Sequence, residues 1–425
     1  MNRKWGDDDD EPKKPAAKPV PRRSALKTGG IAAAGVIGLA AAGAGYRANQ
    51  TGALKSFSDG PGFEPVQAWQ EQLDNAKKPA TPLPESGDTP AVDAKGVIAA
   101  GLLAASPHNS QPWRFVVRDR VIDVFADEAR NLGAVDPRRR EMTIGLGCCI
   151  ENVLIGASAV GVTPLLNLLP DGVDGKALAR ITLYNRARAV TKEAQALGAR
   201  HTNRGPYIRE REVDSKIIDS FNGLITSSLT KLVWLKANTD AGKRFAGATV
   251  KATADFIADE EMVAASNAWF RFSGSGHHDG LTLASVGLSP VKTRVAMMLP
   301  PELIGDPHKA WFEMTRDVHV ATAPLFGLIA VPSLADRAAL IEAGRLWQRM
   351  HVQATVFGLA VQPLNQLMEM VDRDQALKRP SEAEKALTSL SAVGSDVFAF
   401  AFRMGHSRFI TNPSPRRGID EVLGS

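Results

Sequence analysis

The stretch Ala104–Phe115, A-A-S-P-H-N-S-Q-P-W-R-F, is the least generic part of the chain. Before it, apolar residues recur at helical spacing from Asp93 to Ala105, and after it W-R-F-V-V and V-I-D-V-F alternate like two short strands. We therefore expect a helix-to-strand loop. Its small polar side chains and rigid proline suit a backbone that approaches a planar, hydrogen-bonding ligand. The alternative is a serine- and asparagine-rich turn that satisfies only its own backbone.

The composition is that of ordinary globular protein, since 44% of the 425 residues are hydrophobic and 23% are charged. This length allows two or three domain-sized units. The formal net charge of +5 comes without a basic patch interleaved with aromatic residues, so we expect no nucleic-acid partner. The two cysteines, Cys148 and Cys149, are neighbours in an apolar helical stretch. Core packing is favoured for them over redox or metal chemistry.

Residues 1–47 have the three-part form of a bacterial export signal. Arg22 and Arg23 precede the weakly apolar stretch Ile31–Gly45, which resembles a twin-arginine signal, and Ala42–Ala44 offers a small-residue cleavage site. The alternative is an uncleaved anchor, although the stretch is short for a membrane span. We expect a periplasmic or cell-envelope protein, with a membrane tether through the N-terminus if the signal is retained. Residues 48–91 are expected to be a linker or arm.

Hydrophobic periodicity outlines the rest of the chain. It predicts a buried helix over Met142–Val160 and a single helix from Asp240 to about Phe270. It also predicts a long helix over Asp336–Gly358. Strands are predicted near residues 164–169, 179–184, 231–235, 325–331 and 398–403. This mixture indicates an α+β fold.

Three further motifs follow the first loop in order: D-P-R-R-R-E at Asp136–Glu141, R-H-T-N-R at Arg200–Arg204 and P-R-R at Pro415–Arg417. Together with P-H-N-S-Q-P-W at Pro107–Trp113, they resemble the nitroreductase family, and within it the Acg-like branch. The resemblance covers most of the chain. It implies a nitroreductase-like fold that binds FMN, in which the flavin carries the redox chemistry and the protein positions and tunes it.

The chain also contains an internal repeat. The sixteen residues from Gly147 align without a gap with those from Gly344, and both segments reach a glycine, Gly161 or Gly358, before a predicted strand. Two unrelated amphipathic helices are the alternative, but the residues that follow also agree, which favours duplication. We predict two tandem nitroreductase-like halves, residues 92–191 and 192–425, with a lid segment at about 273–300.

Nitroreductase-like proteins are dimers whose flavin lies at the subunit interface. The resemblance therefore implies that the duplicated chain folds as an intramolecular pseudo-dimer. The S-P-H-N-S-Q-P-W loop occurs only in the first half, whereas R-H-T-N-R and P-R-R occur only in the second. One composite FMN site per chain is expected.

Arginines in the second and fourth motifs suit bidentate contact with phosphate oxygens. Each arginine pair alone could equally be a solvated surface cluster. By resemblance, residues of both halves contact the cofactor: Ser106, Pro107, Asn109, Gln111, Arg200, His201, Thr202, Arg204, Pro363, Asn365, Arg416 and Arg417. We expect no catalytic acid or nucleophile. We also expect no metal site at His277 and His278, because no second cluster of ligands has matching spacing.

The predicted function is that of an FMN-dependent oxidoreductase of nitroreductase type. By resemblance, a hydride passes through flavin N5 by ping-pong exchange to a small acceptor such as a nitro compound or a quinone. The donor would be NAD(P)H in the cytoplasm, and a quinol or a partner protein after export. One alternative is a non-catalytic flavin-binding or flavin-sequestering protein with the same fold. Another is an envelope interaction protein without flavin.

Overall fold

The computed structural model describes residue 47 and residues 62–78, 92–271, 276–299, 305–390 and 393–424. The predicted export signal and most of the predicted arm lie outside the described residues. Within the arm, helix α2 (Glu64–Ala76) begins with Pro65 in its first turn and buries Trp69 and Leu73. The Trp69 indole donates a hydrogen bond of 3.0 Å to the carbonyl of Ala194. This part of the arm is therefore packed on the body of the protein.

The first half forms an antiparallel sheet with strand order β1-β2-β4-β3. Its elements are α3 (Ala94–Leu102), β1 (Trp113–Arg118), β2 (Val121–Ala126), α4 (Arg140–Val160), β3 (Val162–Leu168) and β4 (Ala177–Asn185). Asp93 caps α3 by accepting from the amide of Gly96 at 2.8 Å. The two predicted short strands are confirmed and pair as an antiparallel hairpin. The predicted buried helix is also confirmed, and Cys148 and Cys149 are buried in α4.

The second half forms an antiparallel sheet with strand order β5-β8-β10-β9. Its strands are β5 (Lys231–Lys236), β8 (Leu325–Val331), β9 (Ala360–Pro363) and β10 (Val397–Gly405). Its helices are α5 (Lys192–Ala196), α6 (Ser215–Asn222), α7 (Asp240–Ala258), α8 (Glu260–Asn267), α9 (Pro290–Met298), α10 (Pro307–Met314), α11 (Arg337–Val356), α12 (Gln366–Ala376) and α13 (Glu382–Thr388). A short parallel pair, β6 (Phe270–Arg271) and β7 (Leu281–Thr282), lies apart from this sheet.

The single helix predicted from Asp240 is wrong. The structure has two helices, α7 and α8, which meet at Asp259 with φ −93° and ψ 103°. The carboxylate of Asp259 accepts from the amide of Met262 at 3.1 Å and so caps α8. It also receives the guanidinium of Arg373 at 2.8 Å, a contact from a distant helix that local periodicity does not reveal.

The two sheets share one topology. In each half, two strands come first along the chain, a long helix follows, and two further strands complete the sheet, with the fourth strand inserted between the second and the third. The long helices are α4 and α11, and the chain turns after them at Gly161 and Gly358, which have φ of 90° and 66°. Duplication of the halves predicts this shared order, and their common origin stays a prediction.

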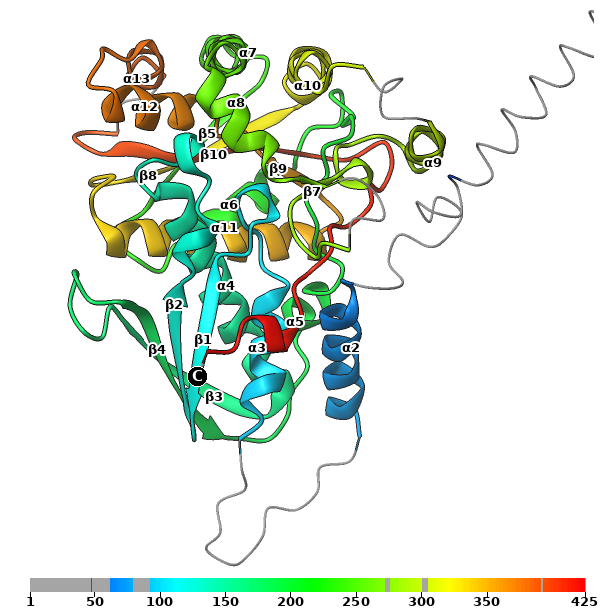
Figure 1. Ribbon diagram of the computed structural model, residues 1–425, viewed down its shortest axis with the longest axis vertical. Helices are drawn as coiled ribbons and strands as arrows, with labels where there is room; N and C mark the ends of the chain where they lie inside the picture. The colour runs from blue at the N-terminus through cyan, green and yellow to red at the C-terminus, as the bar shows by residue number, and fades with distance from the viewer. Residues whose placement is uncertain are drawn as a thin grey trace, which may run out of the picture.

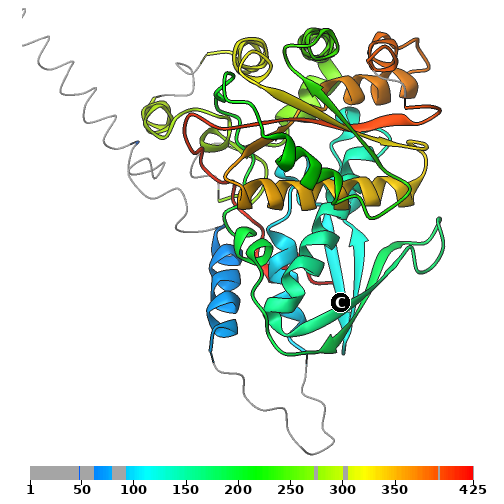
Figure 2. The same cartoon turned by 180° about the vertical axis from the view of Figure 1, so that it is seen from behind.

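Helices α4 and α11 pack against each other between the two sheets (Figure 1). Figure 2 shows α11 lying along one face of the second sheet, while α7, α12 and α13 cover the opposite face. Among the described helices, α4 is the one whose length and apolar composition would allow it to cross a membrane, but most of its residues are buried in the core. The predicted α+β class is confirmed.

The C-terminal tail returns to the first half (Figure 1). The amide of Phe115 in β1 donates to the carbonyl of Val422 at 2.8 Å, and the amide of Gly424 donates to the carbonyl of Phe115 at 2.7 Å. This path carries the P-R-R motif past the loop at Ser106–Gln111. The tertiary fold thus joins two sequence motifs that are about three hundred residues apart.

Candidate functional site

The loop Ser106–Gln111 has an unusual backbone. His108, Asn109 and Gln111 have φ of 47°, 55° and 52°, in the left-handed region that side chains with a Cβ disfavour. The hydroxyl of Ser106 accepts from the amide of Gln111 at 3.0 Å. Pro107 packs on Gly145 of α4, where an added Cβ would lie 3.0 Å from its Cδ. Tertiary contacts therefore hold the loop in a conformation that is strained locally, as at many functional sites.

The C-terminal P-R-R motif contacts this loop directly. The amide nitrogen of Asn109 donates to the carbonyl of Pro415 at 3.0 Å, and Arg416 donates to the Asn109 amide oxygen at 2.6 Å. The backbone amide of Arg417 donates to the Gln111 amide oxygen at 2.8 Å, and its guanidinium donates to the Gln111 carbonyl at 3.0 Å. Four predicted site residues from opposite ends of the body therefore form one buried network.

Arg200 connects the R-H-T-N-R motif to the same region. Its guanidinium donates to the carbonyl of Leu103, at the end of α3, at 2.9 and 3.2 Å. It also contacts Nδ1 of His351 at 3.2 Å, and Nε2 of that ring lies 3.1 Å from the carbonyl of His201. Burial, and next the positive charge of Arg200, lower the pKa of Arg416. His351 was not predicted as a site residue, because its position in the amphipathic helix α11 indicates a core residue.

Arg204 faces the loop from the second half. Its guanidinium donates to the carbonyl of Ser285 at 3.0 Å. Burial, and next the charge of Arg204, lower the pKa of His108 to about 4. Nε2 of His108 lies 3.0 Å from the hydroxyl of Ser266. The neutral imidazole is therefore the dominant form at physiological pH.

Three arginines of this site, Arg200, Arg204 and Arg416, have no carboxylate partner among the described residues. Among the ion pairs of the described residues, none includes Arg200, Arg204 or Arg416. Arg200 and Arg416 are buried and Arg204 is half-buried. Burial lowers the pKa of all three guanidinium groups. Because a buried charge without a counterion is strongly unfavourable, the cluster is suited to bind an anionic group.

Residues 276–289, here called the covering segment, contact the loop Ser106–Gln111 and the R-H-T-N-R motif. The carbonyl of Gly280 accepts from the Asn109 side chain at 3.2 Å, and the carbonyl of His278 accepts from the Gln111 side chain at 2.8 Å. The carbonyl of Ser285 receives Arg204, as noted above. Asp279 anchors the segment through Arg130 and Arg271, and the Arg271 contact is 2.7 Å. The covering segment belongs to the lid predicted at about residues 273–300, whose movement stays a prediction.

The predicted site residues Pro363 and Asn365, on and after β9, lie in different surroundings from the arginines. The Val361 carbonyl accepts from the amide of Asn203 at 3.1 Å, which places β9 beside the R-H-T-N-R motif. Pro363 pairs with Phe402 within the sheet. Asn365 accepts from the amide of Ala401 at 3.0 Å and lies beside Glu141, whose pKa it lowers against the larger effect of burial. In the described structure, it therefore lies next to a buried acidic cluster, and its hydrogen bond is to β10 and not to the arginines.

Thr202 is half-buried within the motif. His201 is also half-buried, and its Nδ1 lies 2.9 Å from the carbonyl of Ala199, while its Nε2 has no hydrogen-bond partner among the described residues. An orphaned ring nitrogen beside the arginines is available to a ligand.

Arg403 supports the site and was missed by sequence analysis. It lies fully buried in β10, donates to the carbonyl of Gly205 at 2.7 Å and to the side chain of Gln362 at 2.8 Å. Its guanidinium carbon lies 3.8 Å from the centroid of the Tyr207 ring, a cation–π contact. The only available signal was an arginine inside an otherwise apolar strand pattern.

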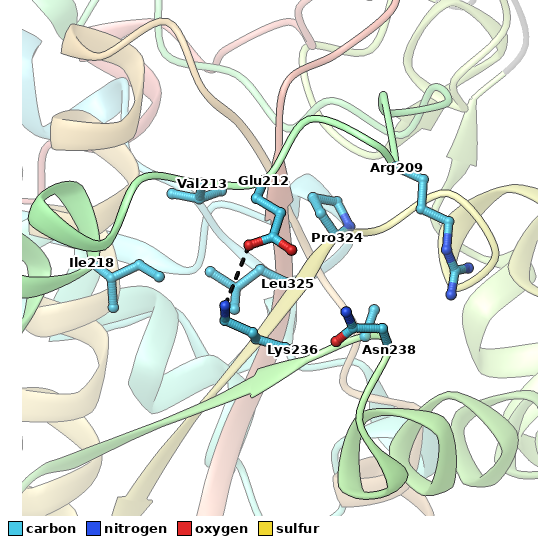
Figure 3. A pocket seen from close by; sticks show the side chains of 9 residues that line it. Arg209, Glu212, Val213, Ile218, Lys236, Asn238, Pro324 and Leu325 are labelled. Atoms are coloured by element: carbon cyan, nitrogen blue, oxygen red, sulfur yellow. Dashed lines mark hydrogen bonds and ion pairs between the residues drawn. The ribbon is translucent and has the colours of Figure 1, made fainter.

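Two surface hollows lie away from the predicted residues. The first, of about 50 Å³, is shown in Figure 3, where Glu212 and Lys236 form an ion pair of 3.3 Å between exposed side chains. The second is an open groove of about 530 Å³ lined by charged residues of α7, α8 and α12, including the paired Arg373 and Asp259. Their charges are largely paired internally. Neither hollow includes a residue from the four sequence motifs.

Metal ligands are not grouped in the described part of the chain. No set of three or more histidine, cysteine, aspartate or glutamate residues there has the geometry to hold a metal ion. Nδ1 of His278 instead lies 3.2 Å from the carboxylate of Glu421 in the C-terminal tail. The positive composite cluster is thus the feature with the clearest ligand-binding chemistry.

Comparison with known proteins gives curated relatives but no match to a model of a protein family. A candidate NAD(P)H nitroreductase of Mycobacterium tuberculosis, acg, is 32% identical over 124 residues, which are 28% of this chain and 37% of the relative. Another candidate NAD(P)H nitroreductase of the same organism, Rv3131, is 23% identical over 284 residues, 66% of this chain and 78% of the relative. The chain therefore matches little more than a third of the length of acg.

Solved structures show weaker likeness. The FMN-dependent nitroreductase NfnB of Mycobacterium smegmatis, in complex with NADPH, is 16% identical with a TM-score of 0.35 and covers 55% of this chain and 97% of its own. A nitroreductase with bound FMN from Desulfitobacterium hafniense is 12% identical with a TM-score of 0.34 and covers 56% of this chain and 100% of its own. The fold is defined by the chain's own strand order.

Proposed function

We propose that this protein is an FMN-dependent oxidoreductase of nitroreductase type with one composite cofactor site per chain. The observation that carries the proposal is the cluster of Arg200, Arg204 and Arg416, which lacks a carboxylate partner among the described residues. A phosphate monoester supplies the negative charge that this cluster needs. The ordered motifs and the two relatives named as candidate nitroreductases support FMN as the molecule that bears it.

The residues present fit the two ends of FMN. The arginines and Thr202 would bind the phosphate and the polar edge of the ring, while Ser106, Pro107 and Asn109 would lie against the ring from the other half. Bound flavin would supply hydride and electron transfer. The protein would bind and orient the cofactor, and the covering segment would exclude water from it. No side chain of the composite site needs to act as a nucleophile.

The proposed site is a pseudo-dimer interface. The shared strand order of the two sheets and the packing of α4 on α11 support a duplicated chain in which both halves build one site. The loop with left-handed His108 and Asn109 occurs in the first half, and the unpaired arginines come from the second. A stoichiometry of one FMN per chain follows from this arrangement.

The proposed acceptor is a small quinone or nitro compound, reduced by ping-pong exchange. The proposed location is the bacterial cell envelope, supported by the twin-arginine pattern at Arg22 and Arg23. An exported enzyme would not meet cytoplasmic NAD(P)H, so its donor would be a quinol or a protein. If the protein remains in the cytoplasm, NAD(P)H is the donor, in keeping with the names of the relatives.

A second candidate function is non-catalytic flavin binding or sequestration. The covering segment favours it, because hydrogen bonds to Asn109, Gln111 and Arg204 hold that segment across the site. A segment that stays closed would retain FMN but exclude large acceptors. The two functions share the cofactor site and differ in whether an acceptor can reach it.

The first test is FMN binding by purified protein, followed by its absorbance spectrum and by the stoichiometry after heat release. We expect one FMN per chain. Arg416→Met should weaken FMN binding by about 10- to 100-fold, because a charge-assisted hydrogen bond contributes about 1.5–3 kcal/mol. Arg209→Met is the matched control, since Arg209 is exposed just beyond the motif. Failure to bind FMN at any concentration would overturn the proposal.

The second test separates enzyme from binder. FMN-loaded protein is reduced with light or dithionite and then mixed with a quinone or a nitro compound. An enzyme reoxidises faster as the acceptor concentration rises. A rate that is independent of acceptor identifies the sequestering function.

A further inference from the structure

None of the predicted cofactor contacts lies in the D-P-R-R-R-E motif, Asp136–Glu141. Its Asp136, Arg140 and Glu141 converge with Glu369 and Asp372 of α12 in a cluster at the start of α4. All five side chains are buried, with Arg140 and Asp372 at 0% exposure. Four carboxyl groups thus surround one guanidinium in the protein interior.

The hydrogen bonds of the cluster leave Glu141 and Glu369 without a full counterion. Arg140 donates to Asp372 at 2.6 Å, and it also donates to the carbonyl of Ala399 at 2.9 Å. Asp136 accepts from the amides of Glu141 and Met142 at 3.0 and 2.8 Å, which caps α4. Arg140 is 3.6 Å from the Glu141 carboxylate, beyond a good hydrogen bond. Ionisation of all four carboxyl groups would therefore leave excess buried negative charge.

The cluster contains more unsatisfied acceptors than unsatisfied donors. Three acceptor oxygens, one each on Glu141, Asp372 and Gln366, and one donor, Nη2 of Arg140, are buried and have no hydrogen-bond partner in the described structure. A protonated carboxyl group is a donor that can satisfy such an acceptor. Burial raises the pKa of Glu141 to about 7, and burial followed by the charge of Glu141 raises that of Glu369. Asp136 and Asp372 act in the same direction on both, and Arg140 opposes them.

The pair lies next to the composite site. Glu141 is one helical turn before Gly145, about 6 Å along the helix axis. Pro107 of the loop Ser106–Gln111 packs on Gly145. Asn365 lies beside Glu141 and directly follows the β9 region that contacts the R-H-T-N-R motif. Glu369 is one turn further along α12 from Asn365. The two glutamates therefore lie between elements that supply opposite sides of the site.

We propose that Glu141 and Glu369 share one proton and deliver it to the acceptor that is reduced in the composite site. This inference rests on the proposed function. A quinone becomes a hydroquinone by gaining two electrons and two protons, and a hydride from reduced flavin carries the two electrons and one proton. The acid pair supplies the second proton: its O–H bond breaks as the hydroquinone O–H bond forms. Water then returns a proton to the resulting carboxylate.

The shared proton is tested on flavin-free protein by infrared spectroscopy. The carbonyl band of a protonated carboxyl group should disappear as pH rises through neutrality. In Glu141→Gln and in Glu369→Gln, the pH at which the band disappears should fall below the neutral range. Each substitution removes one negative partner and so lowers the pKa of the remaining glutamate. Glu261→Gln, which changes an exposed glutamate of α8, should retain the band. Absence of the band in the parent, or its persistence at neutral pH in both variants, would overturn the shared proton.

Delivery of the proton is tested on FMN-loaded, photoreduced protein reoxidised by a water-soluble quinone. Above neutral pH the parent rate should fall about tenfold per pH unit, as expected for a general acid. Both variants should be at least about tenfold slower at low pH and lack this pH dependence. Parent-like rates and pH profiles in both variants would disprove delivery. If no FMN binds, the proposed function fails, while the infrared titration still decides whether the proton is shared.

Discussion

Gly147 of α4 and Gly344 of α11 face each other where the two long helices cross. A Cβ added to either glycine would lie 3.0 Å from the Cα of the other, and each would collide with a carbonyl of the opposite helix, that of Ile341 or Ile144. The contacts are reciprocal, because each carbonyl lies three residues before the facing glycine. The residues that head the sequence repeat thus lie where the backbones of the long helices approach closely.

Alanine at either glycine should destabilise the protein. Gly147→Ala and Gly344→Ala each force a methyl group against backbone, which is expected to cost about 1–3 kcal/mol or more in the free energy of unfolding, measured by urea denaturation. Gly247→Ala is the control, since Gly247 is exposed in α7 with no atom within 4 Å of an added Cβ. That change should stabilise by about 0.5–1 kcal/mol through helix propensity. Equal effects at all three positions would contradict the close crossing.

Removing the charge of Arg204 should change the titration of His108. Arg204→Met removes one of the two causes of the low pKa, so the pKa should rise above about 4 but stay below 6.5, because burial remains. The measurement is an NMR titration of the imidazole signals. Arg209→Met, in the same segment, should leave the His108 pKa where it is. An unchanged value in Arg204→Met would show that the two motifs are not adjacent.

The same histidine should make stability depend on pH. The folded-state pKa of His108, about 4, is below its ordinary 6.5, so the unfolded chain binds more protons between these values. The contribution of His108 to the free energy of unfolding is complete above pH 6.5 and is lost as pH falls toward 4. Relative to His108→Gln, the parent should lose on the order of 2–3 kcal/mol between these limits, measured by urea denaturation at each pH. His277→Gln, at an exposed position, should show the parent's acid sensitivity.

Loss of the Gln111 side chain should loosen the covering segment. Gln111→Ala removes the hydrogen bond to His278, so local opening becomes easier by about 1 kcal/mol. Hydrogen exchange at the amides of Gly280 and Leu281 should then accelerate about fivefold. Gln70→Ala, at an exposed position of α2, removes only a contact with Asp74 and should leave these rates unchanged. Unaltered exchange in Gln111→Ala would show that this bond does not hold the segment closed.

Residues close together in the sequence determined much of the secondary structure. The strands β1 and β2, the buried helix α4 and the long helix α11 follow from local apolar periodicity, which a short window contains in full. The helix ends at Gly161 and Gly358 were likewise predictable from the sequence, because positive φ favours glycine. The four ordered motifs also identified the loop and the arginines that the structure brings together.

Tertiary structure decided which charges are paired. Nothing near Arg416 in the sequence shows that it lies buried beside Asn109, with no carboxylate partner among the described residues. Nor does it show that Asn365 contacts Glu141, or that Asp259 caps α8 while binding Arg373. The physical reason is that helices and strands arise from hydrogen bonding and apolar spacing over a few residues. The energy of a buried charge depends instead on groups that only the folded chain brings within a few ångströms.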